Sequence, residues 1–478
     1  MSVNPLAPSW LRHPDDANAL ATNVWSHNAT RSVDGELLIA GLRASEIVAS
    51  YGTPVYVVDE ADVRARARGI RAAFDEAFAA IGSSARVYYA GKAFLSTRVA
   101  AWMIEDGLNI DVCSAGEFAV AIAGGAEPAR LGLHGNNKSI SEIDRAVSAG
   151  IGAIVIDSVV EVERVAEAAS RHGRVQPVRL RVNSGVHAHT HEYLATARED
   201  QKFGIPLAEV EGVVAQIRGH DSLEFLGLHS HIGSQIFEAD GFAEAASRLF
   251  DVHARLLEGG PVPELNLGGG FGIAYTAADD ALPVDVLATR IAAIVAAAAK
   301  THGVPVPVVA VEPGRAIIGP STTTLYEVGT IKDVLVSVPE EAVPEALEGL
   351  EGQTAIRKYV SIDGGMSDNI RPSLYGADYS ARIANRSSDA DPALVRVAGK
   401  HCESGDIVVH AEYLPGDIAP GDLLAVPATG AYGWAMASNY NYLARPPVVA
   451  VAEGRARLLV RGETEADLLS RDAGLDAE

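Results

Sequence analysis

Residues 86–135, RVYYAGKAFLSTRVAAWMIEDGLNIDVCSAGEFAVAIAGGAEPARLGLHG, decide the fold of this chain. Three short apolar runs (RVYYA, LNIDV and RLGLH) alternate here with two stretches that have helical patterning. Apolar runs of this length, separated by helical crossovers, are typical of buried parallel strands. The same alternation continues as far as Glu312. The predicted strands are Arg86–Ala90, Leu108–Val112, Arg130–His134, Ala153–Asp157, Val178–Asn183, Phe225–His231, Glu264–Leu267 and Val308–Glu312. The predicted helices are Ser96–Asp106, Ala115–Ala123, Ser141–Ala149, Val160–His172, Leu207–Arg218, Phe242–Leu257 and Asp285–His302.

Repetition of this unit predicts an α/β fold. Eight strand–helix units within about 230 residues favour a closed (β/α)8 barrel of the TIM type. An open doubly wound sheet is the alternative, because it also accommodates eight parallel strands. We place the barrel domain at residues 51–321.

The pattern changes after Thr322, where helical periodicity fades and runs rich in Val, Ile and Thr follow. Pro and Gly separate these runs, which predicts a C-terminal all-β domain over residues 322–478. Residues 1–50 contain the strand-like ELLIAG and are expected to join this domain. The predicted strands are Thr323–Val328, Tyr359–Ile362, Leu394–Val397, Ile407–Glu412, Leu423–Pro427 and Val448–Val451.

Composition narrows the classes of function. The chain has 478 residues, of which 62 are acidic and 39 basic, giving a net charge of −23. Such a surface repels nucleic acid and anionic lipid, so neither is an expected partner. No apolar run reaches the ~18 residues of a membrane span, and the N-terminus lacks the pattern of a secretion signal. With only two cysteines, the simplest expectation is a cytoplasmic protein.

The carboxyl ends of barrel strands carry the reactive groups of such folds, so the residues found there are candidates. Lys92 follows the first strand. It is either an ordinary surface lysine or an amine nucleophile that is partly desolvated against Tyr89 and Phe94. After the seventh strand comes the run 268–272 (GGGFG), which is either a tight turn or a loop whose N–H groups surround a phosphate.

Two further strand ends carry candidate groups. Alternation along the sixth strand places His229 and His231 on one side. Either residue is a candidate core histidine. His231 is alternatively a candidate for stacking on an aromatic cofactor. Ser234 is a candidate phosphate donor. Glu312 ends the eighth strand and either pairs with Arg315 or faces the nitrogen of a pyridine ring. A lysine, a glycine loop and a carboxylate at one barrel mouth together suggest pyridoxal 5′-phosphate (PLP).

Other polar clusters have weaker interpretations. His187, His189 and His191 form an H-x-H-x-H run without a recognised partner motif, and we expect no metal there. The predicted β domain contains polar clusters at 363–375, 401–406 and 429–432, whose Gly and Asp residues also suit turns. Cys402 is either an inert thiol or, beside charged residues, an acid.

The chain resembles the diaminopimelate decarboxylases, which belong to the alanine-racemase-like (fold III) group of PLP enzymes. The resemblance extends from YGTPVYVVDE to TGAYGWAMASNYN. The motifs that carry it are YAGKAF, AHTHEYLATAREDQKFGI, HSHIGSQ, LGGGFG, EPGRAI, DGGMSDNIRPSLYGA and HCESGD. It implies that the chain decarboxylates meso-2,6-diaminopimelate to L-lysine and CO2, the last step of bacterial lysine biosynthesis.

The resemblance also implies roles for individual residues. The implied cofactor-binding residues are Lys92, His231, Ser234, Gly269, Glu312, Gly314, Arg315 and Tyr432. The implied substrate-binding residues are Arg315, Arg371, Tyr375, Glu403 and Tyr432. Lys92 would hold the cofactor covalently, and Cys402 would donate the proton that completes the product. The resemblance further implies a homodimer, in which the Cys402 segment enters the partner's site. Ser184, Cys113 and Trp434 depart from the family pattern near the site.

Two alternatives remain open at this point. The chain is either a diaminopimelate decarboxylase or a related decarboxylase that acts on ornithine, arginine or carboxynorspermidine. Arg371 and Glu403 favour the first, because they suit the distal carboxylate and amine of diaminopimelate. A catalytically inactive regulatory homologue is the other alternative, and the presence of Lys92, Glu312 and Cys402 argues against it.

Overall fold

The computed structural model describes residues 4–186, 202–338 and 354–476. The chain divides into two compact units. The barrel unit comprises residues 64–273 and 281–317, and the β unit comprises residues 1–63, 274–280 and 318–478. Each unit is described by itself below.

The barrel unit contains a closed ring of eight parallel strands. Its order is β5-β6-β7-β8-β9-β11-β12-β13, with β13 paired to β5 and β8 paired to β9, and a short strand β10 (Ile205–Pro206) pairs outside the ring with β9. The ring confirms the predicted barrel over the open sheet. The ring strands are β5 (Ala85–Ala90), β6 (Asn109–Val112), β7 (Leu131–Leu133), β8 (Ala153–Ile156), β9 (Gln176–Asn183), β11 (Leu223–His229), β12 (Glu264–Asn266) and β13 (Val308–Val311).

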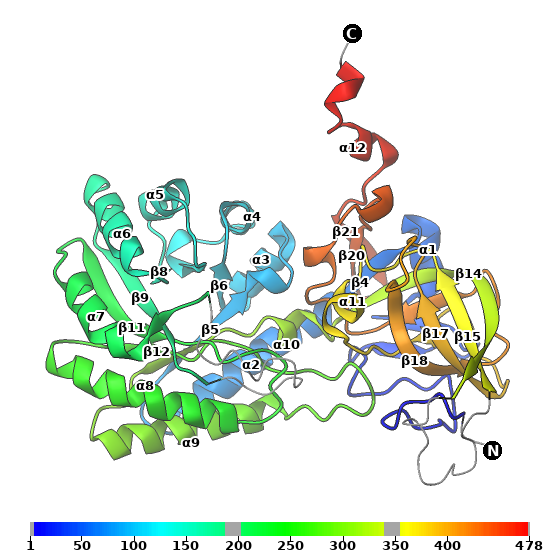
Figure 1. The fold of residues 1–478 in the computed structure, drawn as a ribbon, viewed down its shortest axis with the longest axis horizontal. Coiled ribbons are helices and arrows are strands. Elements are labelled where there is room, and N and C mark those ends of the chain that lie inside the picture. Colours follow the sequence, from blue (N-terminus) through cyan, green and yellow to red (C-terminus); the bar gives the residue numbers. More distant parts are fainter. Residues whose placement is uncertain (1–3, 187–201, 339–353, 477–478) are drawn as a thin grey trace. The chain divides into compact units, whose positions relative to one another are not determined.

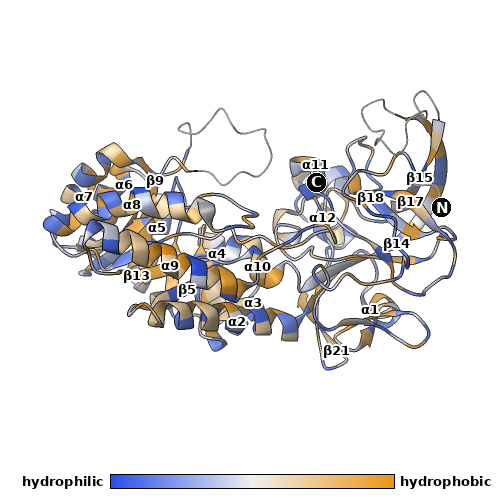
Figure 2. Cartoon of the chain, turned by 90° about the horizontal axis from the view of Figure 1, so that it is seen from below, coloured by the Kyte–Doolittle hydropathy of each residue, from blue (hydrophilic) through white to orange (hydrophobic). Residues whose placement is uncertain are grey.

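Helices surround this ring, as Figure 1 shows for α5 to α9. Their ribbons carry both hydrophilic and hydrophobic segments in Figure 2, the pattern of helices with one face on a core. The helices are α3 (Thr97–Glu105), α4 (Ala115–Ala123), α5 (Ile140–Ala149), α6 (Val159–Arg171), α7 (Val210–Arg218), α8 (Asp240–Glu258) and α9 (Val284–His302). Side chains of Ser96, Ser114 and Ser139 cap three of them by accepting a backbone N–H of the first turn. These caps explain why the predicted starts lie within two residues of the observed ones.

The end of β11 differs from the prediction. The strand stops at His229, two residues before the predicted end, and its pairing with β9 shifts register between Phe225 and Gly227. The alternation rule therefore does not extend to His231, which lies beyond the strand. The expectation that His229 and His231 share one side of a strand is wrong for this reason.

The β unit is built on a seven-strand path with the order β18-β17-β15-β14-β4-β20-β21, and β16 and β19 pair beside it. Strand β4 belongs to this sheet, whereas the predicted barrel domain began at residue 51. The strands are β4 (Val55–Asp59), β14 (Thr322–Ser337), β15 (Thr354–Ile362), β16 (Arg382–Ile383), β17 (Pro392–Ala398), β18 (Ile407–Pro415), β19 (Leu423–Val426), β20 (Val448–Ala452) and β21 (Arg455–Val460).

The remaining elements complete the fold. A three-strand sheet of β1 (Ala29–Arg31), β2 (Leu37–Ile39) and β3 (Leu42–Arg43) precedes α1 (Ala44–Tyr51). The 20-residue helix α2 (Glu60–Ala79) was not predicted from the sequence. Short helices are α10 (Arg315–Ile318), α11 (Arg371–Tyr375) and α12 (Glu465–Leu469). Within the described ranges, no helix combines the length and apolar character needed to cross a membrane.

Candidate active site

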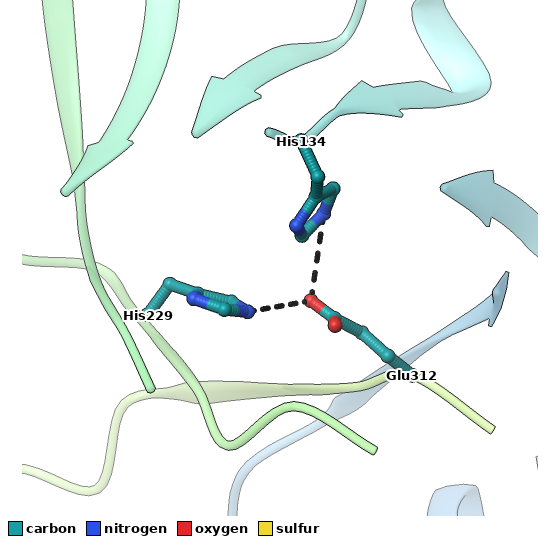
Figure 3. A group of neighbouring side chains, drawn as sticks. All are labelled: His134, His229 and Glu312. Carbon is teal, nitrogen blue, oxygen red and sulfur yellow. Dashed lines mark ion pairs between the residues drawn. The ribbon is translucent and has the colours of Figure 1, made fainter. Parts of the chain in front are cut away.

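A buried carboxylate lies where three barrel strands end. Glu312 directly follows β13, His229 ends β11 and Asn266 ends β12. Asn266 Nδ2 donates to Glu312 Oε1 over 2.7 Å, and His229 Nε2 lies 3.1 Å from the same oxygen. His134, which follows β7, places its Nε2 atom 3.6 Å from that oxygen. Figure 3 shows both imidazoles pointing toward Glu312 from separate strands. We call these four residues the floor cluster.

Electrostatics assign the negative charge of the floor cluster to Glu312. Burial alone would raise the pKa of Glu312, but the adjacent His229 and His134 hold that pKa well below the usual carboxyl range. Burial lowers the pKa of His229 to about 4. Burial raises the pKa of Asp111, whose Oδ1 lies 3.0 Å from His134 Nε2. These pKa shifts favour one ionised carboxylate, that of Glu312, over ionisation of both Glu312 and Asp111.

The ligand atoms of His134, His229 and Glu312 lie within 4.8 Å of one another, which is also a spacing suited to a metal ion. Asn266 donates an N–H group to the same carboxylate oxygen that a metal would need. A hydrogen-bonded carboxylate accounts for this arrangement without an ion.

The glycine run after β12 packs its backbone tightly against the segments that follow β13 and β11. A Cβ atom on Gly269 would lie 2.1 Å from the Glu312 carbonyl oxygen, and one on Gly270 would lie 2.3 Å from the Gly233 oxygen. Gly268 has a φ of +70° and its carbonyl accepts the Glu312 N–H over 2.9 Å. Side chains are thus excluded here, and the backbone forms a cradle beside the floor cluster.

The segment after β11 joins this cradle. Gly269 N–H donates to His231 Nδ1 over 3.3 Å, so Nδ1 is an acceptor and the ring proton of neutral His231 resides on Nε2. Burial lowers the pKa of His231 well below its usual value, which favours that neutral form. Arg315 Nη2 donates to Ser234 Oγ over 2.9 Å. Gly314 lies close to β5, since a Cβ there would be 3.0 Å from Ala90 Cβ.

Lys92 lies in a single 3-10 turn, Gly91–Ala93, that directly follows β5. Its side chain is exposed, whereas Tyr89 and Phe94 are buried. The Tyr89 hydroxyl donates to the Phe94 carbonyl over 2.6 Å, so these two residues pack with each other. The partial desolvation of Lys92 between them, one of the two interpretations drawn from the sequence, is not what the structure shows.

The β unit carries the other candidates. Arg371, at the start of α11, is only 5% exposed and lies over the Tyr275 ring, with its guanidinium carbon 3.9 Å from the ring centroid. Its Nη1 atom donates to the Tyr379 hydroxyl over 2.8 Å. These contacts hold a buried cation in a fixed orientation. Tyr375, at the end of the same helix, is exposed.

Residues 399–406 form a loop between β17 and β18 in which Cys402 and Glu403 are exposed. Buried Asp406 fixes the loop, because its carboxylate accepts the N–H groups of His401 over 2.8 Å and Met366 over 2.6 Å. Tyr432 is half-buried and has a φ of +62°, a conformation unusual for a side chain of this size. The β unit thus contains every candidate that the sequence did not place in the barrel.

The residues that depart from the family pattern have defined surroundings. Buried Ser184 accepts a hydrogen bond from the Ser230 hydroxyl over 3.2 Å. Exposed Cys113 donates its backbone N–H to Glu117 Oε2 over 2.6 Å. Trp434 Nε1 donates to the Pro446 carbonyl over 3.1 Å. The histidines at 187, 189 and 191 lie outside the described residues.

Sequence reasoning missed two members of the floor cluster, His134 and Asn266. Both carried a usable signal, because each stands at the carboxyl end of a strand, where Glu312 also stands. His134 was placed at the end of a predicted strand without being named as a candidate, and Asn266 was treated as part of a strand.

Comparison of this chain with known proteins shows which family it resembles. Residues 61–319 match the model of the "Pyridoxal-dependent decarboxylase, pyridoxal binding domain" family. The chain is 50% identical to the diaminopimelate decarboxylase of Mycobacterium tuberculosis, covering 94% of this chain and 98% of that one. It is 46% identical to the Corynebacterium efficiens diaminopimelate decarboxylase, covering 95% of both chains. A crystal structure of diaminopimelate decarboxylase from M. jannaschii with L-lysine matches with a TM-score of 0.83 at 28% identity, covering 94% of this chain and 98% of that one.

Proposed function

Because the chain belongs to the diaminopimelate decarboxylases, a family of pyridoxal-dependent enzymes, we propose how its own residues divide the work of that reaction. The chain is a carboxy-lyase that uses PLP to convert meso-2,6-diaminopimelate to L-lysine and CO2. The relatives favour this substrate over ornithine, arginine or carboxynorspermidine.

The floor cluster at the barrel mouth fits the cofactor in one respect. An ionised, buried carboxylate suits a protonated pyridine nitrogen. When bound, PLP supplies a ring that accepts the electrons of the bond to the departing carboxylate. Glu312 would hold the proton of the ring nitrogen, with its orientation set by contacts at Oε1.

Each barrel residue then has a task toward the cofactor. Lys92 would hold it covalently through its exposed amine, and the neutral imidazole of His231 would lie against its ring. Ser234, Gly269, Gly314 and Arg315 surround its phosphate, with the Arg315–Ser234 hydrogen bond orienting both side chains. Asn266 and His229 orient Glu312, and His229 and His134 keep its pKa low.

The β unit supplies the groups for the substrate. Arg371, Tyr375, Glu403 and Tyr432 bind diaminopimelate together with Arg315. Arg371 suits the distal carboxylate, because its guanidinium is held rigidly by Tyr275 and Tyr379. Glu403, exposed on its loop, suits the distal amine. The Cys402 thiol donates the proton that completes L-lysine.

We further propose that the working unit is a cytoplasmic homodimer with shared active sites. Lys92 and Cys402 come from different compact units, and the resemblance to the family favours their meeting across a two-fold axis. The absence of a membrane-crossing helix in the described residues is consistent with a location in the cytoplasm.

The single observation that carries the proposal is the buried Glu312, whose pKa is held low by His229 and His134. The test combines product analysis with chemical trapping. Purified enzyme should release CO2 and L-lysine from meso-diaminopimelate and little CO2 from ornithine or arginine. Borohydride reduction of the resting enzyme should attach the cofactor to the peptide that contains Lys92. Attachment at another lysine, such as Lys138, would contradict the assignment of the cofactor lysine.

A further inference from the structure

One asparagine side chain contacts the loop that presents Cys402. Asn441 Oδ1 accepts the backbone N–H of Cys402 over 3.2 Å, and the same oxygen lies 3.2 Å from His401 Nδ1. His401 is buried, and its ring stacks on Tyr440 with the centroids 5.2 Å apart. All of these residues belong to the β unit.

The hydrogen bonds fix both the histidine tautomer and the orientation of the amide. The Ser367 backbone N–H, which is only a donor, points to His401 Nε2 over 3.3 Å, so Nε2 is an acceptor. The Ser367 hydroxyl lies 2.8 Å from the same nitrogen and can donate to it as well. In neutral His401 the ring proton is therefore on Nδ1, and it faces Asn441. The Cys402 N–H is also only a donor. Both donors need an acceptor at this point, which assigns the amide oxygen of Asn441 to it.

The backbone of Asn441 is suited to this task. Its φ is +52° and its ψ is 25°, a left-handed conformation that Asn tolerates better than most side chains. Asn439, two residues earlier, instead donates to the Leu443 carbonyl over 3.0 Å and to Glu463. Asn439 thus stabilises the same segment without contacting the Cys402 loop through those bonds.

Asp406 and Asn441 hold different parts of the loop. Asp406 binds the N–H of His401, at one end of the His401–Cys402 dipeptide, and Asn441 binds the N–H of Cys402. The peptide plane before Cys402 is therefore fixed by Asn441. Since this peptide plane contains the Cα atom from which the Cys402 side chain branches, holding the plane restricts where its thiol can lie.

We propose that Asn441 is a positioning residue for the proton transfer: its amide oxygen holds the peptide that aims the Cys402 thiol. The inference rests on the proposed role of Cys402 as proton donor. A displaced proton donor slows the chemical step more than it weakens substrate binding, because small misplacements in an active site cost large factors in rate.

Two substitutions of Asn441 separate the effect of its side-chain oxygen from the effect of its left-handed backbone conformation. Asn441→Gly keeps the left-handed backbone but has no side-chain acceptor, and Asn441→Asp keeps an acceptor in the same place. In the PLP-loaded enzyme, Asn441→Gly should lower kcat roughly 10- to 100-fold, with KM changed less than about threefold. Asn441→Asp should retain kcat within about fivefold of wild type. Amide exchange at Cys402 should quicken in the Gly variant and stay slow in the Asp variant.

Asn439→Ala is the matched control, and it should leave kcat near wild type. If it lowers kcat as much as Asn441→Gly does, the segment acts only as general support and the inference is wrong. If Cys402→Ala abolishes turnover while Asn441→Gly does not lower it, the inference fails and the proposed proton donor stands. If Cys402→Ala retains wild-type turnover, the proposed proton donor is wrong, and the inference is overturned with it.

Discussion

Replacing Glu312 with Gln changes the charge of the floor cluster while keeping its shape. A glutamine oxygen in place of Oε1 can still accept from Asn266 Nδ2, which lies 2.7 Å away, and stays 3.1 Å from His229 Nε2. The amide cannot, however, hold a proton on the pyridine nitrogen. Preorganised electrostatic groups of this kind contribute roughly 10²–10³ in kcat, or about 2.7–4 kcal/mol. We therefore expect Glu312→Gln to bind PLP and to lose turnover by that factor.

The assay measures L-lysine formation at saturating meso-diaminopimelate, after the absorbance of bound cofactor shows equal loading. Glu312→Asp is the control, because it keeps the charge on a shorter side chain and should retain more activity than the Gln variant. Fully loaded Glu312→Gln enzyme with turnover within threefold of wild type would refute the argument. Glu312 would then be a structural partner of His229 and Asn266.

Three other substitutions test separate parts of the site and fold. Lys92→Ala should lose the borohydride-stable cofactor adduct, and dialysis should remove its PLP. Arg371→Ala should raise KM for diaminopimelate roughly 10- to 150-fold, since a charge-assisted hydrogen bond contributes about 1.5–3 kcal/mol, while cofactor absorbance stays normal. Asp368→Asn should alter the pH dependence of stability. Burial raises the pKa of Asp368 to about 7, so the native state binds more protons than the unfolded state between about pH 4 and 7. The contribution of Asp368 to the free energy of unfolding should fall by on the order of 4 kcal/mol across that range, and urea unfolding at several pH values would measure its loss in the variant.

Each of these has a result that would contradict it. A trapped adduct in Lys92→Ala would place the cofactor on another lysine. Arg396→Ala removes a different arginine that lies over a ring, that of Tyr359, and an equal rise of KM there would show that Arg371 is not specific. For Asp368, parallel stability curves of wild type and variant from pH 4 to 7 would exclude titration of this group.

Much of the barrel could be predicted from the sequence because strand and helix signals repeat with serine caps between them. Helix α2 was missed for a physical reason: its first turns contain VRARARG, whose alternation of apolar and charged residues imitates a strand. Its helical spacing appears only over a longer window, in the buried Val63, Ile70, Phe74 and Phe78. Residues 55–59, which form β4, fell inside the predicted barrel domain because the barrel unit begins a few residues later, at Arg64. The pairing partners of β4, β14 and β20, are hundreds of residues away.

The residues of the site also divide into those that a local sequence pattern predicts and those that it does not. Lys92, Glu312 and the glycine run were identifiable because strand ends in a barrel meet at one mouth. The contacts of Glu312 were not identifiable from the sequence. Hydrogen bonds between strands depend on the register of those strands, and a local sequence pattern does not contain that register. A contact such as that of Asn441 with Cys402 joins two irregular segments, and no periodicity predicts it.

The central claim is that Lys92 and Cys402 of different subunits act in one active site, and subunit complementation tests it most directly. Lys92→Ala and Cys402→Ala homodimers should each be nearly inactive. After exchange of subunits, confirmed by mass spectrometry, half of the dimers should be mixed, and each of these has one intact site of two. The account predicts recovery of roughly a quarter of wild-type activity. If exchange is complete and no activity returns, Lys92 and Cys402 act within one chain, and the shared site is wrong.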